Sequence, residues 1–402
     1  MSLQEFKIWL DQIHKPEYFW FAKRLSANDT GLTGGHQVGF YLPTEVGFKI
    51  FPGFRGKEAN PKRKFKTVTE SHGYPKDVQA TWWNQKTRNE IHVTQWGGKE
   101  SPLQDPEATG SLVIFAFHRP SISSDTEDCR IWLCRTPDEE DLFEQKFGVV
   151  EPGDWLSHEP YKPVSALPAA EKKSSCWLNP SEIPAAWLKK FPSGEQIIEK
   201  TVTLGKFGAL PPDKRLLKRR DCEYELFRSV EHAVLTPALK KGFSGVDDFL
   251  SLAQSTLQRR KSRSGKSLEL HISKIFDEEG LHKGKTYSVG AISENGKKPD
   301  FLFPSADCYH SPKFPAARLR MLGAKTTVKD RWRQVADEAD RIGRKHILTL
   351  QEGVSGPQMK QMEKAGIVLV VPETLQAKYP SEVREKLITL SEFIKEIKSL
   401  SA

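Results

Sequence analysis

Short runs in which hydrophobic and polar residues alternate characterise the first part of the chain. Turns rich in Gly, Pro, Asn and Asp separate the strand-like runs, which are residues 37–42, 91–96, 112–117 and 130–134. Before them, residues 3–12 carry apolar side chains at helical spacing. The pattern predicts an N-terminal domain that is mainly β, with one helix at its start.

The second half of the chain has a longer hydrophobic period. Apolar residues three and four positions apart predict helices at residues 223–234, 246–259 and 268–279. Strand-like runs follow at 301–303, 320–326, 346–350 and 367–371, with helical patterns at 331–342 and 357–364 between the later runs. Strands that alternate with helices predict an α/β domain whose sheet is partly parallel.

Residues 151–176 differ from both halves. They crowd proline and polar residues together without any apolar period, which is typical of an interdomain linker. A chain of 402 residues fits two or three domains at ~100–200 residues each. We therefore predict an N-terminal domain at 1–160, a linker at 161–176 and a C-terminal domain at 177–402.

The composition excludes some classes of protein. No apolar run approaches the ~20 residues of a membrane-spanning helix, and the N-terminus lacks the basic start and long apolar stretch of a secretory signal. The five cysteines are odd in number and scattered, so a disulfide framework is improbable and a reducing cytoplasm is expected. Cys129 and Cys134 have no second Cys/His pair at zinc spacing, which argues against structural zinc.

Charge gives the first indication of a partner. The 61 Lys and Arg against 52 Asp and Glu leave a net charge of +9, which favours an anionic partner such as nucleic acid, although many soluble proteins are mildly basic. Residues 265–267 resemble the end of a phosphate-binding P-loop, but Arg260 stands where that motif needs glycine. An NTPase is therefore rejected.

One combination of residues suggests a reaction. Asp300 precedes the strand-like run 301–303, Lys325 lies in the run 320–326, and Glu338 lies in the following helical pattern. Metal-dependent phosphodiester hydrolysis needs carboxylate oxygens that hold Mg²⁺ and a cation that positions or activates water. A Pro-Asp dipeptide alone more often marks a turn. The placement of Asp300 and Lys325 beside apolar runs favours the catalytic interpretation.

The segment after Lys325 also fits the start of a helix. Thr327 can serve as the N-cap with Asp330 at the third helical position. Alternatively, a first turn that presents Lys329, Asp330 and Arg331 can meet DNA base edges, because Arg or Lys reads guanine and Asp accepts a hydrogen bond from cytosine. The residues alone leave both roles open.

Six stretches, in matching order over nearly the whole chain, resemble the EcoRII type of restriction endonuclease. They are residues 23–31, 34–39, 261–271, 297–305, 325–334 and 348–355. The resemblance implies an N-terminal effector-binding DNA domain of pseudobarrel type and a C-terminal restriction-endonuclease-like PD-(D/E)XK α/β domain. It also implies a Mg²⁺-dependent homodimer that recognises CCWGG, cuts before the first cytosine and binds a second copy of the site as effector.

Carried onto this sequence, the resemblance makes Asp300 and Glu338 metal ligands and Lys325 the catalytic lysine. Lys329 becomes a second active-site or base-reading cation. Glu269 becomes an auxiliary acid near the metal, although an exposed helical glutamate would explain it as well.

The resemblance also assigns recognition residues in the C-terminal domain. Asp330 and Arg331 match positions that read G·C pairs, and Arg220 and Tyr224 match the pocket for a flipped central base. The ring of Tyr224 offers an extruded base a surface for stacking. Ordinary helix packing is the alternative role for Tyr224.

In the N-terminal domain the resemblance assigns effector binding to a separate set of residues. They are His36, Tyr41, Lys86, Arg88 and Glu90. The family has a basic pair after the glutamate, whereas this chain has Ile91 and His92, which puts the strength of effector binding in doubt. Arg24 lies in a matching stretch but receives no role.

We therefore expect a cytoplasmic type II restriction endonuclease that flips bases. Its expected partner in a restriction-modification system is a DNA cytosine methyltransferase that acts on the same site. One alternative is a catalytically inactive, two-domain DNA-binding regulator, which the intact Asp300, Lys325 and Glu338 disfavour. A structure-selective repair nuclease would share the metal site but needs no base-reading tract at residues 329–331. Plasmid incubation with Mg²⁺ or EDTA separates the three.

Overall fold

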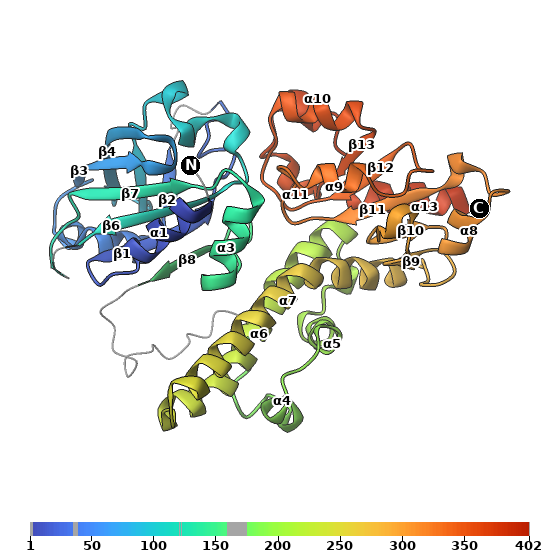
Figure 1. Ribbon diagram of the computed structural model, residues 1–402, viewed down its shortest axis with the longest axis horizontal. Coiled ribbons are helices and arrows are strands. Elements are labelled where there is room, and N and C mark those ends of the chain that lie inside the picture. The colour runs from blue at the N-terminus through green and yellow to red at the C-terminus, as the bar shows by residue number, and fades with distance from the viewer. Residues whose placement is uncertain (1–2, 35–38, 120, 122, 159–174, 402) are drawn as a thin grey trace. The chain divides into compact units, whose positions relative to one another are not determined.

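A computed structural model describes residues 3–34, 39–119, 121, 123–158 and 175–401. The chain folds into two compact units (Figure 1). The first comprises Met1–Lys162, Gln351–Met359 and Lys378–Arg384, and the second comprises Pro163–Leu350, Lys360–Ala377 and Glu385–Ala402. The boundaries 1–160, 161–176 and 177–402 remain a prediction.

The N-terminal unit is built on an eight-stranded sheet of order β2-β5-β4-β3-β7-β6-β1-β8. Its strands are β1 (Tyr18–Arg24), β2 (Phe40–Leu42), β3 (Lys62–Thr69), β4 (Tyr74–Trp83), β5 (Glu90–Thr94), β6 (Leu112–His118), β7 (Asp128–Leu133) and β8 (Trp155–His158). All neighbouring strands are antiparallel except β3 and β7. Three helices accompany the sheet: α1 (Leu3–Ile13), α2 (Thr44–Ile50) and α3 (Pro137–Phe147).

Both faces of this sheet are covered at its centre. Successive strand residues point to opposite faces, so Phe19 and Phe21 of β1 enter one apolar core while Trp20 and Ala22 enter the other, with α1 and α3. Strand β6 lies between the same two cores, which explains its uninterrupted apolar sequence. The prediction of a mainly β domain with one helix at its start is confirmed.

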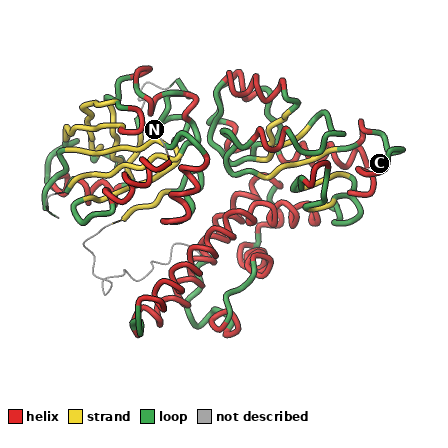
Figure 2. The backbone as a smooth tube through the Cα atoms, in the orientation of Figure 1, coloured by secondary structure: helices red, strands yellow, loops and turns green. Residues whose placement is uncertain are grey.

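The C-terminal part of the chain holds a five-stranded sheet of order β13-β12-β11-β10-β9 (strands yellow in Figure 2). The strands are β9 (Ser288–Val289), β10 (Phe301–Phe303), β11 (Arg320–Ala324), β12 (Lys345–Leu348) and β13 (Ile367–Val370). Strands β11, β12 and β13 are parallel, whereas β9 and β10 are antiparallel to their neighbours. The predicted partly parallel α/β sheet is confirmed.

The remaining described helices also lie in this part of the chain, although Ser381–Arg384 and the start of Gly356–Lys364 belong to the first compact unit. They are α4 (Ala185–Lys189), α5 (Gly194–Gly205), α6 (Pro212–Lys241), α7 (Val246–Glu278), α8 (Ala306–His310), α9 (Trp332–Ala336), α10 (Gly356–Lys364), α11 (Glu373–Gln376), α12 (Ser381–Arg384) and α13 (Leu390–Ser401). The long helices α6 and α7 run side by side as a hairpin (Figure 1). None of the described helices is long and apolar enough to cross a bilayer.

Helix α7 corrects a sequence prediction. The sequence predicted separate helices at 246–259 and 268–279, with a run rich in Lys and Arg between them. Helix α7 instead continues through this run, residues 259–266. Gly265 weakens a helix by only ~1 kcal/mol. Ion pairs with α6 support the segment: Arg263 Nε lies 3.0 Å from Glu223 Oε1, and Arg260 Nη2 lies 2.6 Å from Glu231 Oε2.

Helix α9 corrects a second prediction. The helix begins at Trp332 rather than after Thr327, so Thr327 is not its cap and Asp330 is not in its first turn. The preceding backbone still pairs with the sheet, because the Lys325 amide donates to Leu348 O at 2.9 Å. The helix ends at Ala336, and Glu338 therefore lies in the turn after the helix rather than on it.

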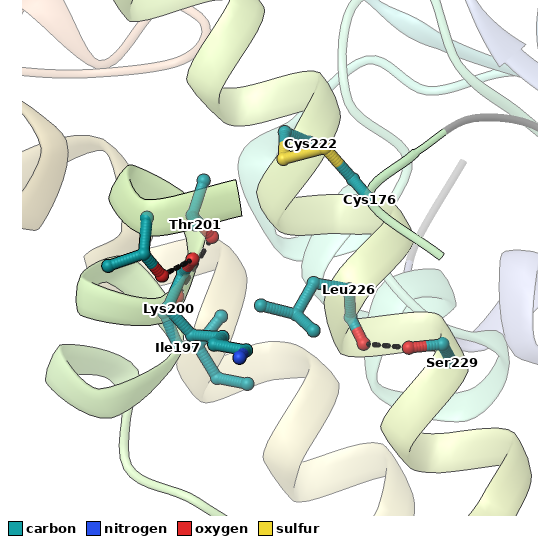
Figure 3. The surroundings of a disulfide bond; sticks show 8 residues. Cys176, Ile197, Lys200, Thr201, Cys222, Leu226 and Ser229 are labelled. Carbon is teal, nitrogen blue, oxygen red and sulfur yellow. Dashed lines mark hydrogen bonds between the residues drawn. A yellow bond between two sulfur atoms is a disulfide. The ribbon is translucent and has the colours of Figure 1, made fainter. Parts of the chain in front are cut away.

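The cysteines give a third correction. A disulfide joins Cys176 to Cys222 on α6, close to the contact of α5 with α6 (Figure 3). The prediction that disulfides are improbable was therefore wrong for this pair, because partners distant in sequence cannot be recognised from cysteine count alone. Cys129 and Cys134 are buried free thiols, and Cys308 is a half-buried one.

Candidate active site and DNA-recognition residues

Asp300 and Lys325 form the centre of the candidate active site. Asp300 directly precedes β10, and β10 pairs with β11, whose end leads into Lys325. The Asp300 carboxylate Oδ2 accepts hydrogen bonds from the Ala324 amide at 2.7 Å and from Lys325 Nζ at 3.1 Å. The pairing of the two strands therefore fixes the acid and the lysine against each other.

Glu338 reaches the same centre from the turn after α9. Burial raises the pKa of its carboxyl, Lys325 opposes the shift, and Asp300 adds to it. The carboxylate of Glu338 therefore lies within electrostatic reach of both Asp300 and Lys325. The structure brings together the three residues that the sequence assigned to catalysis.

Glu269 supplies a third carboxylate, from α7. Burial, reinforced by Asp300, raises its pKa to about 7, while Lys325 and Lys266 oppose the shift. An exposed helical glutamate would not show such a shift, because water would screen its charge. The side chain of Glu269 is therefore part of the candidate active site.

The donor set fits a hard divalent cation. Asp300, Glu269 and Glu338 all interact electrostatically with Lys325, and burial together with repulsion from Asp300 raises the pKa of both glutamates. A bound cation would relieve that repulsion, and carboxylate oxygens are the ligands that Mg²⁺ takes. Within the described residues, no three His, Cys, Asp or Glu side chains already form a metal-ligand cluster.

The predicted base-reading residues occupy the turn between β11 and α9. Lys329, Asp330 and Arg331 are all partly exposed there. Asp330 Oδ1 accepts a hydrogen bond from Arg333 Nη1 at 2.9 Å. These residues lie four to six positions after Lys325, so the predicted recognition residues and the predicted catalytic lysine share one segment.

Arg220 and Tyr224 lie one turn apart on α6. Arg220 is buried, whereas 36% of Tyr224 is exposed. The Arg263 guanidinium of α7 lies 4.8 Å from the centre of the Tyr224 ring, a cation–π distance. Burial and the charge of Arg220 hold the pKa of His271 on α7 well below its ordinary value. Tyr224 therefore contacts a residue of α7, and Arg220 interacts electrostatically with another.

The N-terminal unit gathers part of the predicted effector site. Tyr41 on β2 lies opposite His92 on β5, with 3.8 Å between ring centres. Glu90 Oε2 lies 3.3 Å from His92 Nε2. Burial, together with the charge of Glu90, raises the pKa of Tyr41, while the charge of Arg88 opposes this rise. His92, which the sequence marked as a departure from the family pattern, therefore lies inside the cluster.

Three effector residues remain, of which two lie in a turn and one lies outside the residues that the structure describes. Lys86 and Arg88 are exposed in the turn between β4 and β5. His36 lies outside the described residues.

Arg24 has a clear structural role. Its guanidinium is buried and forms ion pairs with Glu140 and Glu144 of α3, each at 2.8 Å. Its Nε also donates to the Val150 carbonyl at 2.6 Å, and these partners raise the pKa of Arg24 despite its burial. Arg24 therefore ties β1 to α3 and the segment that follows it.

The sequence missed two lysines next to Glu338. Lys297 Nζ donates to the Asp337 carbonyl at 2.7 Å, and the Lys345 ammonium donates to the Ala336 carbonyl. Lys297 begins one of the stretches that carry the family resemblance. No sequence signal distinguishes Lys345, because its role depends on the turn after α9.

The fold and the site define a nuclease class. An acid before one strand, a lysine after the next and two further glutamates, on a partly parallel sheet flanked by helices, characterise a restriction-endonuclease-like domain. Comparisons with known proteins then give the family. The family "EcoRII C terminal" matches residues 227–394, and "Restriction endonuclease EcoRII, N-terminal" matches residues 14–161.

Individual relatives agree with these matches. The type II restriction enzyme EcoRII of Escherichia coli is 42% identical over 409 residues, covering 100% of this chain and 99% of that protein. The type II restriction enzyme SsoII of Shigella sonnei is 27% identical over 157 residues, covering 37% of this chain and 50% of that protein. The chain belongs to the EcoRII family and is a type II site-specific deoxyribonuclease, which confirms the resemblance.

Two solved structures are also similar. Metal-depleted Ecl18kI in complex with uncleaved, modified DNA has a TM-score of 0.43 and 22% identity, covering 56% of this chain and 85% of that one. The B3 domain of UbaLAI restriction endonuclease with cognate DNA has a TM-score of 0.28 and 20% identity, covering 38% of this chain and 98% of that one.

Proposed function

We propose that this enzyme hydrolyses double-stranded DNA at CCWGG, before the first cytosine, with Mg²⁺ as its metal. One observation carries the catalytic part of the proposal. The Asp300 carboxylate is fixed by the Ala324 amide and Lys325, within a group that also contains Glu269 and Glu338. A catalytically inactive regulator would not need to keep three carboxylates in mutual repulsion.

Each residue of the group has a role in this proposal. Asp300 and Glu338 hold the metal through their carboxylate oxygens, and Glu269 is an auxiliary acid beside it. When bound, Mg²⁺ polarises the scissile phosphate and lowers the pKa of water. Lys325 positions the attacking water and offsets the negative charge that grows on the phosphate in the transition state. Lys329 supplies a second cation.

Recognition falls to two sets of residues in the proposal. Lys329, Asp330 and Arg331 read the G·C pairs, because arginine or lysine can donate to guanine while a carboxylate accepts from cytosine. Arg220 and Tyr224 receive the flipped central base. The exposed ring of Tyr224 and the cation over it support a stacking role.

The N-terminal unit binds a second copy of the site as effector. His36, Tyr41, Lys86, Arg88 and Glu90 are its proposed contacts, and the gathering of Tyr41, Arg88 and Glu90 around His92 supports them. The enzyme acts as a homodimer, because two related cuts suit two related active sites. A DNA cytosine methyltransferase that modifies the same site is its partner in the cytoplasm.

Plasmid DNA tests the proposed function. Incubation with Mg²⁺ should give fragments that end at CCWGG, and EDTA should abolish them. Binding without cleavage would instead identify the inactive regulator. Cleavage at branched or damaged structures without a common sequence would identify the repair nuclease.

A further inference from the structure

The turn that carries Glu338 has an unusual backbone. Helix α9 ends at Ala336, and Ala339, directly after Glu338, has a φ of 51°. A residue with a Cβ adopts this left-handed conformation only at an energetic cost, so neighbouring groups must hold the turn in place. The described structure offers contacts on both sides of Glu338.

Two lysines bind the carbonyls that immediately precede Glu338. Lys345 of β12 is buried, and its ammonium donates to the Ala336 carbonyl. Lys297 Nζ donates to the next carbonyl, that of Asp337, at 2.7 Å. Burial lowers the pKa of Lys345, while Asp340, Asp337 and Glu338 oppose this shift.

A glutamate binds the turn on the other side. The Asp340 amide donates to Glu294 Oε2 at 3.2 Å, and the Tyr309 hydroxyl donates to Glu294 Oε1 at 2.6 Å. Glu294 and Lys297 belong to one closed loop, in which the Ser293 amide donates to the Lys297 carbonyl at 2.7 Å. The loop leads to Asp300 three residues later.

We propose that Glu294, Lys297 and Lys345 are positioning residues that fix Glu338 relative to Asp300 so that both carboxylates bind one divalent cation. We call these three residues the turn clasp. The inference rests on the proposed metal-dependent function and adds residues that touch neither the metal nor the DNA. The loop that grips the Glu338 turn also delivers Asp300, so one segment sets the separation of the two acids.

The size of the effect follows from the geometry of metal binding. Groups that orient metal ligands typically contribute 10–100-fold to metal affinity or activity, because a displaced carboxylate loses its bond to the ion. Loss of the Lys297 ammonium would release the Asp337 carbonyl and allow the turn to relax. Metal affinity should fall while the fold remains, since Lys297 lies at the partly exposed edge of the domain.

The experiment measures metal binding rather than cleavage. Full-length protein is mixed with a CCWGG duplex carrying a non-hydrolysable linkage at the scissile position, and free Mn²⁺ is counted by electron paramagnetic resonance. Lys297→Met should weaken Mn²⁺ binding by roughly 10–100-fold without changing Tm measured without metal. Lys298→Met removes the same charge from the exposed neighbouring residue and should stay close to wild type.

Glu294 provides a second, conservative comparison. Glu294→Gln keeps an oxygen that can accept from the Asp340 amide, so it should retain more Mn²⁺ affinity than Glu294→Ala. Lys345→Met should act in the same direction as Lys297→Met. If the substitution of buried Lys345 prevents folding, the Mn²⁺ affinities of the Lys297 and Glu294 variants alone test the proposal.

Three results have distinct meanings. Wild-type Mn²⁺ affinity in Lys297→Met overturns the turn clasp, and so does an equal loss in Lys298→Met, which would reflect net charge alone. Unchanged Mn²⁺ binding in Asp300→Asn would instead overturn the proposed metal site itself. Loss in Asp300→Asn and in Lys297→Met, with retention in Lys298→Met, supports both.

Discussion

Asp300 makes structural hydrogen bonds through the same carboxylate to which we assign a chemical role. Its Oδ2 atom already accepts two hydrogen bonds, from the Ala324 amide and from Lys325. These bonds hold the Asp300 carboxylate in place, and its charge raises the pKa of Glu338 and Glu269. A substitution at Asp300 or Lys325 therefore changes the chemistry more than the fold.

We expect Asp300→Asn or Lys325→Ala to reduce the cleavage rate by roughly 10²–10⁴-fold. Either substitution removes transition-state stabilisation of about 3–5 kcal/mol, which corresponds to a rate loss of that size. Binding to a specific duplex should change little, since neither residue is assigned to base reading. Single-turnover cleavage and gel-shift titrations measure the two quantities separately. A variant that cuts at the wild-type rate would show that the assigned centre is wrong.

Arg331 is assigned to recognition rather than to chemistry. Arg331→Ala should weaken binding to CCWGG by about 1–3 kcal/mol, because a lost bidentate contact with guanine is of that size. Binding to random DNA should weaken much less. Titrations of matched and mismatched duplexes at one salt concentration measure the difference, and an equal loss on both would identify a phosphate contact.

Strand β12 contains a group that makes stability depend on pH. His346 is fully buried in β12, and burial lowers its pKa from 6.5 to about 4. The charge of Glu396 opposes this shift, whereas the charges of Arg344 and Arg320 reinforce it. The unfolded chain therefore takes up a proton at a higher pH than the folded protein does. Above pH 6.5 the contribution of neutral His346 is complete, and it is lost as the pH falls towards 4.

This shift predicts an acid-sensitive free energy of unfolding. Urea titrations should give a smaller free energy at pH 4.5 than at pH 7, and His346→Leu should flatten that dependence. Absolute stability of the variant does not matter for the test, because the slope against pH is the quantity compared. A slope identical to that of the wild type would assign the acid sensitivity to other groups.

The elements show what local sequence can and cannot predict. Strands β6, β10 and β13 follow from apolar runs bounded by turns, because strand periodicity is a local property. The continuity of α7 depends on Glu223 and Glu231 of α6, which lie about 30 to 40 residues earlier in the chain. The late start of α9 follows a segment whose first residue, Lys325, still donates to Leu348 of β12. Contacts between distant residues decide both features.

The candidate site divides in the same way. The sequence pattern alone suggested Asp300, Lys325 and Glu338, because the first two border apolar runs and the third follows in a helical pattern, and Glu269 was added as an auxiliary acid. The turn clasp was not predictable, because Lys345 meets the Ala336 carbonyl only after β12 and α9 have packed together. The disulfide of Cys222 was missed for the same reason.

At the scale of the whole enzyme, the proposal of an effector site predicts dependence on the number of sites. A plasmid with one CCWGG site should resist cleavage, and a plasmid with several should be cut, because a second bound site supplies the coupling free energy. A fragment that starts near Trp177 but retains Cys176, and with it the disulfide to Cys222, should cut one-site DNA. The measurement is the initial cleavage rate of each plasmid at equal site concentration.

His92 makes this prediction specific to the present chain. With histidine and isoleucine in place of a basic pair, fewer phosphates are neutralised, so effector binding should depend less steeply on salt. Equal cleavage of both plasmids by the full-length enzyme, with no gain for the fragment, would exclude effector activation and leave an ordinary dimeric nuclease.

Helix α7 carries Arg263, which lies over the Tyr224 ring, and Glu269, which lies in the candidate active site, six residues further along. A single inserted residue between them would rotate one relative to the other by about 100° and lengthen their separation by about 1.5 Å. If Tyr224 and Glu269 have the roles proposed above, side chains along that interval can be exchanged, but a change in its length would separate base recognition from chemistry. We therefore expect insertions and deletions to be absent between positions 263 and 269 in related enzymes.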